Sequence, residues 1–205
     1  MTRDWRYAFC GLILVGILVG SIFLIRSRLP KTSSLKVNSA RSQGPVNAPI
    51  QIIEYSDFQC PACQFAQPTL LSLLSERQGK IRLIYQHFPL EGHRWSRLAH
   101  QSAECASVQN QFWGFHDRLY ANQTDWSASV EAPLEQFMRY AKEVNLDLDI
   151  FAHCIAESRI NKKIEEERLS GLGLGVKMTP SFFVNGELVV GSDALRKKVD
   201  ELIKK

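Results

Sequence analysis

The sequence predicts an α/β domain in which a strand–helix–strand unit and a strand–strand–helix unit flank a block of helices, with a transmembrane helix in front. Two short β-branched runs enclose a CPAC motif that is followed by a helical pattern. A long central stretch has apolar residues at helical spacing, and an Asn-Gly pair separates two extended runs near the carboxyl end. The length of 205 residues suits one domain with attachments.

The amino-terminal segment is expected to be a membrane anchor. Residues 7–25 carry no charge, and as a helix they span most of a ~30 Å hydrocarbon core. A cleaved signal peptide is the alternative, but no A-x-A-like site follows the apolar run. We therefore expect an anchor at 1–26, a flexible polar linker at 27–44 and the folded domain at 45–205.

The orientation of this anchor follows less directly. More basic residues follow the apolar run than precede it, and a strict positive-inside count places the domain in the cytoplasm. Long domains, however, are translocated largely regardless of charge. We expect a single-pass protein of the cell membrane whose domain lies on the periplasmic or cell-wall side.

The first elements of the domain are expected to form a βαβ unit. Residues 50–55 and 81–87 are apolar, β-branched runs that predict strands, and residues 64–77 between them predict an amphipathic helix. Strands that are joined through a helix normally run parallel, so we expect these two strands to be parallel.

A helical insertion is expected over about 92–172. Its helical segments are 95–109, 111–120, 133–144 and 149–171. Extended runs follow at 180–184 and 188–190, and Asn185-Gly186 between them favours a type I′ hairpin turn. Ser192 and Asp193 are candidate caps for a last helix that runs to Lys204.

The net charge of +4 does not indicate a nucleic-acid partner. Residues 45–205 hold 18 basic and 20 acidic residues, so the excess of positive charge belongs to the amino-terminal segment. The folded part has no clustered basic face, which nucleic-acid binding requires.

The CPAC motif carries the chemistry. Cys60 is expected at the first turn of a helix, with Cys63 three residues later on the same face and within disulfide reach. Pro61 suits the first helical position. Unpaired amides and the helix dipole favour a thiolate, and such thiols have pKa values of roughly 3.5–7.5 instead of ~8.5. This predicts a redox disulfide, with Cys60 as the nucleophile and Cys63 as the buried resolving thiol.

A zinc site and a purely structural disulfide are the other uses of two close cysteines. Zinc takes four ligands, commonly as two close pairs, whereas Cys105 and Cys154 stand alone and no histidine has zinc-finger spacing. A strand-to-helix turn scarcely needs a disulfide. We expect neither a metal nor a cofactor.

Residues 47–63, NAPIQIIEYSDFQCPAC, resemble the opening of the DsbA-like branch of the thioredoxin superfamily, and most of all its anchored bacterial members of the BdbD type. The resemblance covers roughly 44–205 and includes the FWGFHD stretch at 112–117 and Thr179-Pro180 before the third strand. It implies a thioredoxin-like fold with an inserted helical subdomain and thiol–disulfide oxidoreductase activity.

The resemblance also implies further site residues. The family places a cis-proline opposite the redox cysteines, here Pro180, which turns the Thr179 backbone toward an extended substrate beside Cys60. Without the resemblance, Pro180 is simply a proline that begins a strand. Related proteins use a buried acid in the first strand as a proton relay, and Glu54 occupies that place. The alternative for Glu54 is an exposed position at a strand end.

The sequence departs from DsbA between the two cysteines. DsbA has Pro-His there, and this chain has Pro61-Ala62. A cationic histidine beside the thiolate stabilises the reduced form and makes a stronger oxidant. The redox potential and the direction of electron flow therefore stay open.

Cys105 and Cys154 both fall in the helical block. Some DsbA-like proteins have a second bridge, and we expect a structural disulfide between two helices here. It would close a loop of about 50 residues, worth up to ~4 kcal/mol in the chain-entropy model. Two buried free thiols are the alternative.

Together the residues and the resemblance predict an extracytoplasmic enzyme that donates the Cys60–Cys63 disulfide to cysteine-containing exported proteins. The resemblance implies reoxidation by a quinone-linked membrane partner of the DsbB or vitamin K epoxide reductase type. A disulfide reductase or isomerase, and a peptide-binding chaperone at the membrane surface, are the alternatives. Isomerases of the superfamily dimerise through an added domain, for which residues 27–44 are too short, so we expect a monomer.

Overall fold

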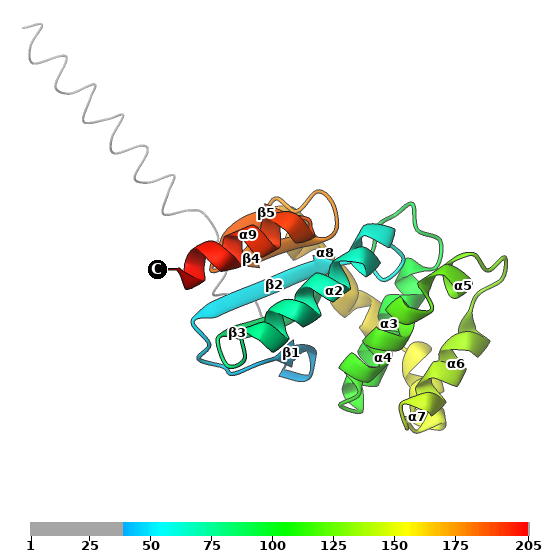
Figure 1. Ribbon diagram of the computed structural model, residues 1–205. Helices are drawn as coiled ribbons and strands as arrows, with labels where there is room; N and C mark the ends of the chain where they lie inside the picture. The colour runs from blue at the N-terminus through cyan, green and yellow to red at the C-terminus, as the bar shows by residue number, and fades with distance from the viewer. Residues whose placement is uncertain (1–38, 205) are drawn as a thin grey trace, which may run out of the picture. The chain divides into compact units, whose positions relative to one another are not determined.

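The computed structural model describes residues 39–204, so the expected anchor at 1–26 and most of the expected linker lie outside the described residues. Within this range, no helix combines the length and the apolar character that a membrane crossing requires. Figure 1 shows a central sheet with helices on both of its faces and a block of helices beside one end. This is the predicted α/β arrangement with a helical insertion.

The described residues form a five-stranded sheet in the order β1-β3-β2-β4-β5. The strands are β1 (Ser42–Gln43), β2 (Ile50–Ser56), β3 (Ile81–His87), β4 (Ser181–Val184) and β5 (Glu187–Val190). β2 and β3 run parallel, which confirms the predicted βαβ unit. β1, β4 and β5 each pair antiparallel with their neighbours.

The hairpin between β4 and β5 turns at Asn185 and Gly186. Both residues have positive φ, +48° and +86°, as a type I′ turn requires. The helix after it, α9 (Ser192–Ile203), begins differently from the prediction. Gly191, with φ +82°, occupies its N-cap, and no side chain caps the helix, because the tight turn out of β5 needs a left-handed residue there.

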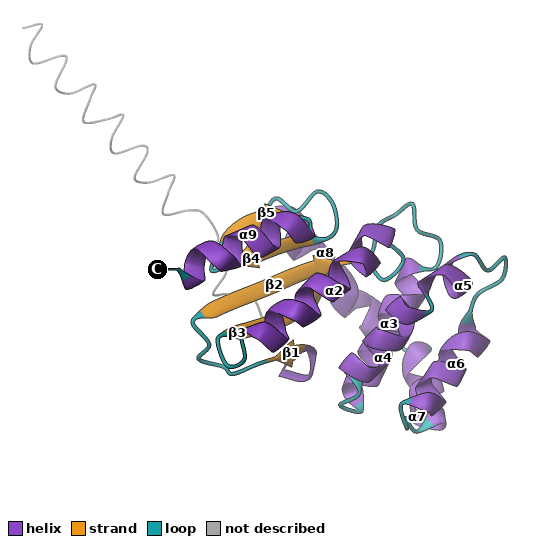
Figure 2. Cartoon of the chain, in the orientation of Figure 1, coloured by secondary structure: helices purple, strands orange, loops and turns teal. Residues whose placement is uncertain are grey.

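Two helices cover one face of the sheet, and one covers the other (Figure 2). α2 (Pro61–Glu76) and α9 pack on the face to which alternate residues of β2 point. The core on this side is formed by residues of both helices and the sheet: Ile50, Ile52, Ala66, Leu70, Leu73, Ile81, Leu83, Phe182, Val184, Leu195 and Val199. On the opposite face, α8 (Ser158–Gly173) approaches so closely that a Cβ on Gly171 would meet the Tyr55 ring at 2.8 Å.

The helical insertion lies between β3 and β4. Its helices are α3 (Ser96–Val108), α4 (Phe112–Ala121), α5 (Gln123–Ser127), α6 (Leu134–Glu143), α7 (Leu148–Ile155) and α8. The predicted single helix over 149–171 is wrong, because the chain breaks at Ala156 and Glu157. α7 packs into the helical block while α8 turns back to the sheet, and one straight helix cannot do both. The short helix α5 was not predicted.

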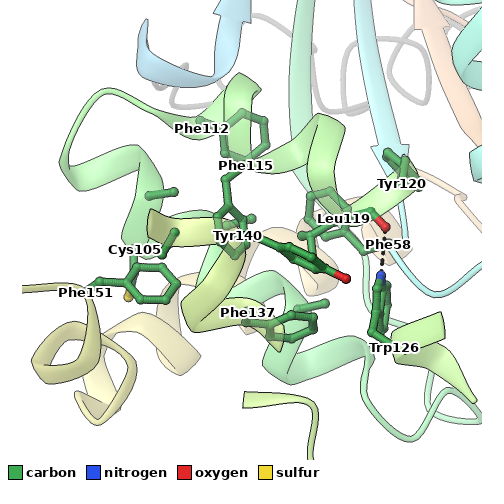
Figure 3. Packing of buried hydrophobic residues seen from close by; sticks show 14 of the residues in the cluster. Phe58, Cys105, Phe112, Phe115, Leu119, Tyr120, Trp126, Phe137, Tyr140 and Phe151 are labelled. Atoms are coloured by element: carbon green, nitrogen blue, oxygen red, sulfur yellow. Dashed lines mark hydrogen bonds between the residues drawn. The ribbon is translucent and has the colours of Figure 1, made fainter. Parts of the chain in front are cut away.

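Buried aromatic rings form the core of this block. Figure 3 shows Phe115, Phe137 and Phe151 packed together, with Trp126 nearby. The indole N–H of Trp126 donates to the Leu119 carbonyl oxygen over 2.7 Å, so its polar edge is satisfied inside the core.

The predicted boundary between linker and domain at residue 45 is wrong. A 3-10 turn, η2 (Ser39–Arg41), and β1 precede it and belong to the fold. The Arg41 side chain is fully buried, where it pairs with Glu167 and, through Nε at 3.2 Å, with Glu104. A polar sequence looks like a linker, but a buried arginine needs acidic partners, which only the folded chain brings together.

Candidate active site

The two cysteines lie at the junction of β2 and α2. β2 ends at Ser56, and the Cys60 N–H donates to the Asp57 carbonyl oxygen over 3.1 Å, which closes the turn into the helix. Cys60 is the N-cap of α2, and Pro61 is its first helical residue, where a missing N–H costs nothing. Cys63 follows one turn later, so both sulfurs lie at the amino end of the helix.

Cys60 is the acidic thiol of the pair. Its pKa is lowered to about 5, first by the hydrogen bond from the Cys63 thiol. Burial opposes this, and the N–H groups of Cys63 and Ala62 at the start of the helix reinforce it. At neutral pH Cys60 is therefore a thiolate, the form that takes part in disulfide exchange.

Cys63 differs from Cys60 in both its burial and its acidity. Its side chain has no exposed surface, whereas Cys60 keeps 7%. Burial raises the pKa of Cys63 well above its usual value, and the neighbouring Cys60 raises it further. The Asp57 N–H donates to Cys63 Sγ over 3.5 Å, which holds this sulfur in its buried position.

The structure places the Thr179-Pro180 loop against Cys60. The peptide bond between Thr179 and Pro180 is cis. Cys60 Sγ lies 3.6 Å from the Thr179 carbonyl oxygen, although 119 positions separate the two residues in the sequence.

Glu54 is fully buried, in β2, and is not at an exposed strand end. Burial raises the pKa of its carboxyl group, while His116, Ser56 and Gln67 lower it by smaller amounts. Gln67 Nε2 donates to Glu54 Oε1 over 3.4 Å. A raised pKa keeps a carboxyl group protonated to higher pH than usual, which suits a group that gives and takes a proton.

Asp57 is a site residue that the sequence analysis missed. Its buried carboxylate accepts the N–H groups of Gln59 and Leu90, each over 2.8 Å, and the Ser96 hydroxyl over 2.7 Å. Burial alone would raise the pKa of Asp57, but hydrogen bonds from His100 and His93 outweigh it and lower the pKa. The sequence feature that could have identified Asp57 is its place as an acidic residue between a buried strand and the CPAC motif.

His93 lies in the loop after β3, close enough to Cys60 to interact with its charge. Its Nδ1 lies 2.8 Å from Asp57 Oδ2, and this hydrogen bond raises the pKa of His93. The Cys60 thiolate raises it further. The Pro61-Ala62 dipeptide has no histidine, so the histidine that interacts with the thiolate comes from this loop, which no local motif indicates.

The unpredicted helix α5 holds the loop before Cys60. Gln123 Nε2 donates to the carbonyl oxygens of Phe58 and Cys60, over 2.7 Å and 2.9 Å. The helical insertion therefore contacts the redox motif directly and fixes its backbone.

The second cysteine pair is a disulfide. Cys105 in α3 and Cys154 in α7 are joined, with their Cα atoms 5.7 Å apart. The bridge lies in the aromatic core shown in Figure 3, whereas Cys60 and Cys63 are free thiols. It ties together the helices that surround the core.

The surface beside Cys60 is apolar. A cavity of about 420 Å³ is lined by Pro61, Ala62, Phe65, Pro180, Gly191 and Ser192. Phe65 on its rim is 80% exposed, and Met178, next to the Thr179-Pro180 loop, is 56% exposed. Among the described residues, no group of three or more His, Cys, Asp or Glu side chains is placed to hold a metal ion.

Comparison with known proteins agrees with this geometry. A family model described as thioredoxin matches residues 36–205. The chain is 30% identical over 207 residues to the probable disulfide bond formation protein D of Bacillus anthracis, covering 97% of this chain and 94% of that protein. The structure superposes on crystalline BdbD of Bacillus subtilis with a TM-score of 0.69 and 19% identity, over 80% of this chain and 93% of that one.

A further relative is a much longer protein. The chain is 35% identical over 145 residues to a Na(+)/H(+) antiporter NhaA 3 of Salinispora tropica, which is 70% of this chain but 21% of the antiporter. The chain thus spans about a fifth of the length of this relative. The family match and the nearly full-length match to protein D show that the chain belongs to the thioredoxin family, in its DsbA-like branch of thiol–disulfide oxidoreductases.

Proposed function

We propose that this protein oxidises cysteine pairs in exported proteins by donating the Cys60–Cys63 disulfide. The observation that carries the proposal is the contrast within the pair, with a pKa of about 5 at Cys60 and a strongly raised pKa at buried Cys63. A stabilised thiolate is a good leaving group. An enzyme disulfide whose reduction releases such a thiolate is therefore readily transferred to a substrate.

The reaction has two exchange steps. A substrate thiolate attacks Cys60 Sγ, the Cys60–Cys63 bond breaks, and Cys63 leaves as a thiolate that takes up a proton. The second substrate thiolate then attacks the substrate sulfur of the mixed disulfide and releases Cys60 as a thiolate. The substrate loses two electrons to form its disulfide, and the enzyme gains them as the reduced pair. In this direction Cys60 is the sulfur that substrates attack. When the reduced pair is reoxidised, Cys60 is the nucleophile and Cys63 the resolving thiol.

The surroundings of Cys60 suit an unfolded substrate. The cavity of about 420 Å³ and the exposed ring of Phe65 provide an apolar surface beside the sulfur. The Thr179-Pro180 loop lies on the other side and offers backbone groups to an extended chain. We propose that this loop aligns the substrate strand while the apolar surface binds neighbouring side chains without sequence preference.

The remaining partners and the location belong to the same proposal. The reduced pair must be reoxidised, and we propose a quinone-linked membrane protein of the DsbB or vitamin K epoxide reductase type for this step. Anchoring residues 1–26 in the same membrane raises the effective concentration of the two partners. The domain then acts outside the cytoplasm as a monomer, where the Cys105–Cys154 disulfide also persists.

The experiment that tests the activity uses the full-length chain and two substrates. The oxidised protein should restore activity to reduced, unfolded ribonuclease in stoichiometric amounts, and Cys60→Ser should not. Equilibration with glutathione, followed by mass spectrometry of the Cys60–Cys63 peptide, gives the potential. A value near −120 mV supports a donor, whereas a value near −270 mV together with rapid insulin reduction would make the protein a reductase.

A further inference from the structure

The Ser56 side chain lies on the same face of β2 as Glu54, and Cys63 approaches it from α2. Successive side chains of a strand point to opposite faces, so Glu54 and Ser56 share the face of β2 that is covered by α2. Ser56 is fully buried, and its Oγ lies 2.9 Å from the hydroxyl oxygen of Tyr120. A buried serine held in this way has a defined hydroxyl position.

Cys63 approaches the same residue from the helix. The N–H that donates to Cys63 Sγ belongs to Asp57, so the sulfur lies beside the peptide bond that joins Ser56 to Asp57. Cys63 Sγ and the Glu54 side chain thus lie beside Ser56, one next to the peptide bond that follows it and the other two residues before it on the same strand face. Ser56 lowers the pKa of each of these two buried acids.

The Glu54 carboxyl group has one oxygen available for this contact. Oε1 accepts from Gln67 Nε2, while Oε2 is buried without a hydrogen-bond partner among residues 39–204. An unpaired buried carboxyl oxygen is costly in a folded protein and often marks a catalytic group. A hydroxyl group can accept one proton while it donates its own, so Ser56 can connect Cys63 to this oxygen.

We propose that Ser56 is a catalytic residue that transfers the proton between Cys63 and Glu54, with Tyr120 orienting its hydroxyl. When the enzyme is reoxidised, Cys63 S–H passes its proton to Ser56 Oγ as the Ser56 proton moves to Glu54 Oε2. The Cys63 thiolate then attacks Cys60 Sγ in the mixed disulfide and expels the thiolate of the oxidant. When the enzyme acts as a donor, the proton returns by the same path. This inference rests on the proposed redox function of the pair.

The test separates the two steps of oxidation by oxidised glutathione. Reduced full-length protein is mixed with oxidised glutathione, quenched in acid and analysed by mass spectrometry. Formation of the Cys60–glutathione mixed disulfide needs only Cys60, whereas its resolution needs deprotonated Cys63. Ser56→Ala should slow resolution at least ~10-fold and leave formation within ~2-fold, since general acid–base groups contribute roughly 10²–10⁴-fold.

Three variants sharpen the result. Glu54→Gln should also slow resolution, and the double variant should be no slower than the slower single one, because both act on one proton path. Ser102→Ala is the matched control: Ser102 is another buried serine, in α3, and its hydroxyl has no hydrogen-bond partner among the described residues. It should resolve at the wild-type rate.

The outcomes distinguish the possible failures. Resolution at the wild-type rate in Ser56→Ala, or equal slowing of both steps, would overturn the role of Ser56. If Ser56→Ala does not show cooperative unfolding, Tyr120→Phe replaces it, and unchanged resolution in that variant overturns the role of the hydroxyl pair. If the wild-type protein forms no mixed disulfide at Cys60, the proposed function itself fails.

Discussion

Cys60 Sγ lies 3.6 Å from the backbone carbonyl oxygen of Thr179. Cys60 lies at the start of α2, before the helical insertion in the sequence, and Thr179 lies just before β4, after the insertion. The reactive sulfur is thus bounded by one helix end, by one loop and by the buried Cys63. Its acidity and its access to substrates both follow from this enclosure.

The acidity of Cys60 is expected to depend on Cys63. Cys63→Ala removes the thiol whose hydrogen bond is the largest cause of the lowered pKa, so the pKa of Cys60 should rise from about 5 toward the ordinary ~8.5. The rate of iodoacetamide alkylation at the Cys60 peptide, measured against pH by mass spectrometry, checks this. Cys63→Ser keeps a hydrogen-bond donor and should lie much closer to the wild type. If the midpoint of the alkylation curve of Cys63→Ala lay at the wild-type pH, the low pKa of Cys60 would come from the helix end and not from Cys63.

The stability of the reduced protein should depend on pH through the same thiol. The pKa of Cys60 is lowered in the folded state, so its contribution is fully present above the unfolded-state pKa near 9 and is lost as the pH falls toward 5. The unfolding free energy of reduced wild type should therefore rise with pH relative to reduced Cys60→Ser between pH 5 and 9. The slope is at most about 1.4 kcal/mol per pH unit. Urea denaturation at several pH values measures this slope. If the unfolding free energies of the wild type and of Cys60→Ser changed with pH in parallel, Cys60 would not be a thiolate in the folded protein.

The close approach of α8 to the sheet predicts a contrast between two glycines of one helix. A Cβ at position 171 would meet the Tyr55 and Phe88 rings at 2.8–2.9 Å, and Gly171→Ala should destabilise the protein by about 1–3 kcal/mol. Gly173→Ala finds nothing within 4 Å and should be neutral or stabilising, by up to about 1 kcal/mol. Thermal unfolding of the two variants compares them directly. Equal effects would contradict the packing of α8 against Tyr55.

The Cys105–Cys154 disulfide should contribute stability without contributing to exchange. Replacing both cysteines by alanine removes a cross-link between residues 49 positions apart and should cost about 2–5 kcal/mol. The denaturant midpoint of the full chain measures this loss. The pKa of Cys60 serves as the control and should stay near 5, because the groups that lower it are Cys63, Ala62 and Thr179 and not the bridge. A large shift of that pKa would show that the bridge also positions the redox pair.

The buried ion pair of Arg41 predicts that the segment before residue 45 is structural. Arg41→Met leaves Glu104 and Glu167 without their buried partner and should destabilise the protein by about 3–5 kcal/mol. Arg139→Met is the control, since the Arg139 side chain is 62% exposed and its pair with Glu143 is worth little. Chemical denaturation distinguishes the two. If Arg41→Met were as stable as the wild type, the segment before residue 45 would belong to the linker and not to the fold.

Local sequence determined the parts of the fold that depend on short-range rules. The β-branched runs, the amphipathic pattern after CPAC and the Asn185-Gly186 turn specify β2, α2, β3 and the last hairpin, because pleat, helical period and positive φ are local properties. The place of Cys60 at a helix start also follows from the motif, with Pro61 fixing the first turn. The helix break at Ala156 and the fold of residues 39–44 do not follow, since they depend on distant packing.

For the site, the sequence by itself determined which two sulfurs meet and that one of them begins a helix. The tertiary structure decided the surroundings, because burial and charge arise from elements far apart in the chain. Asp57 carries its charge inside the protein because His93, Ser96 and Leu90 converge on it after β3 is in place. The hydrogen bond of Ser56 with Tyr120 likewise exists only once α4 lies against β2.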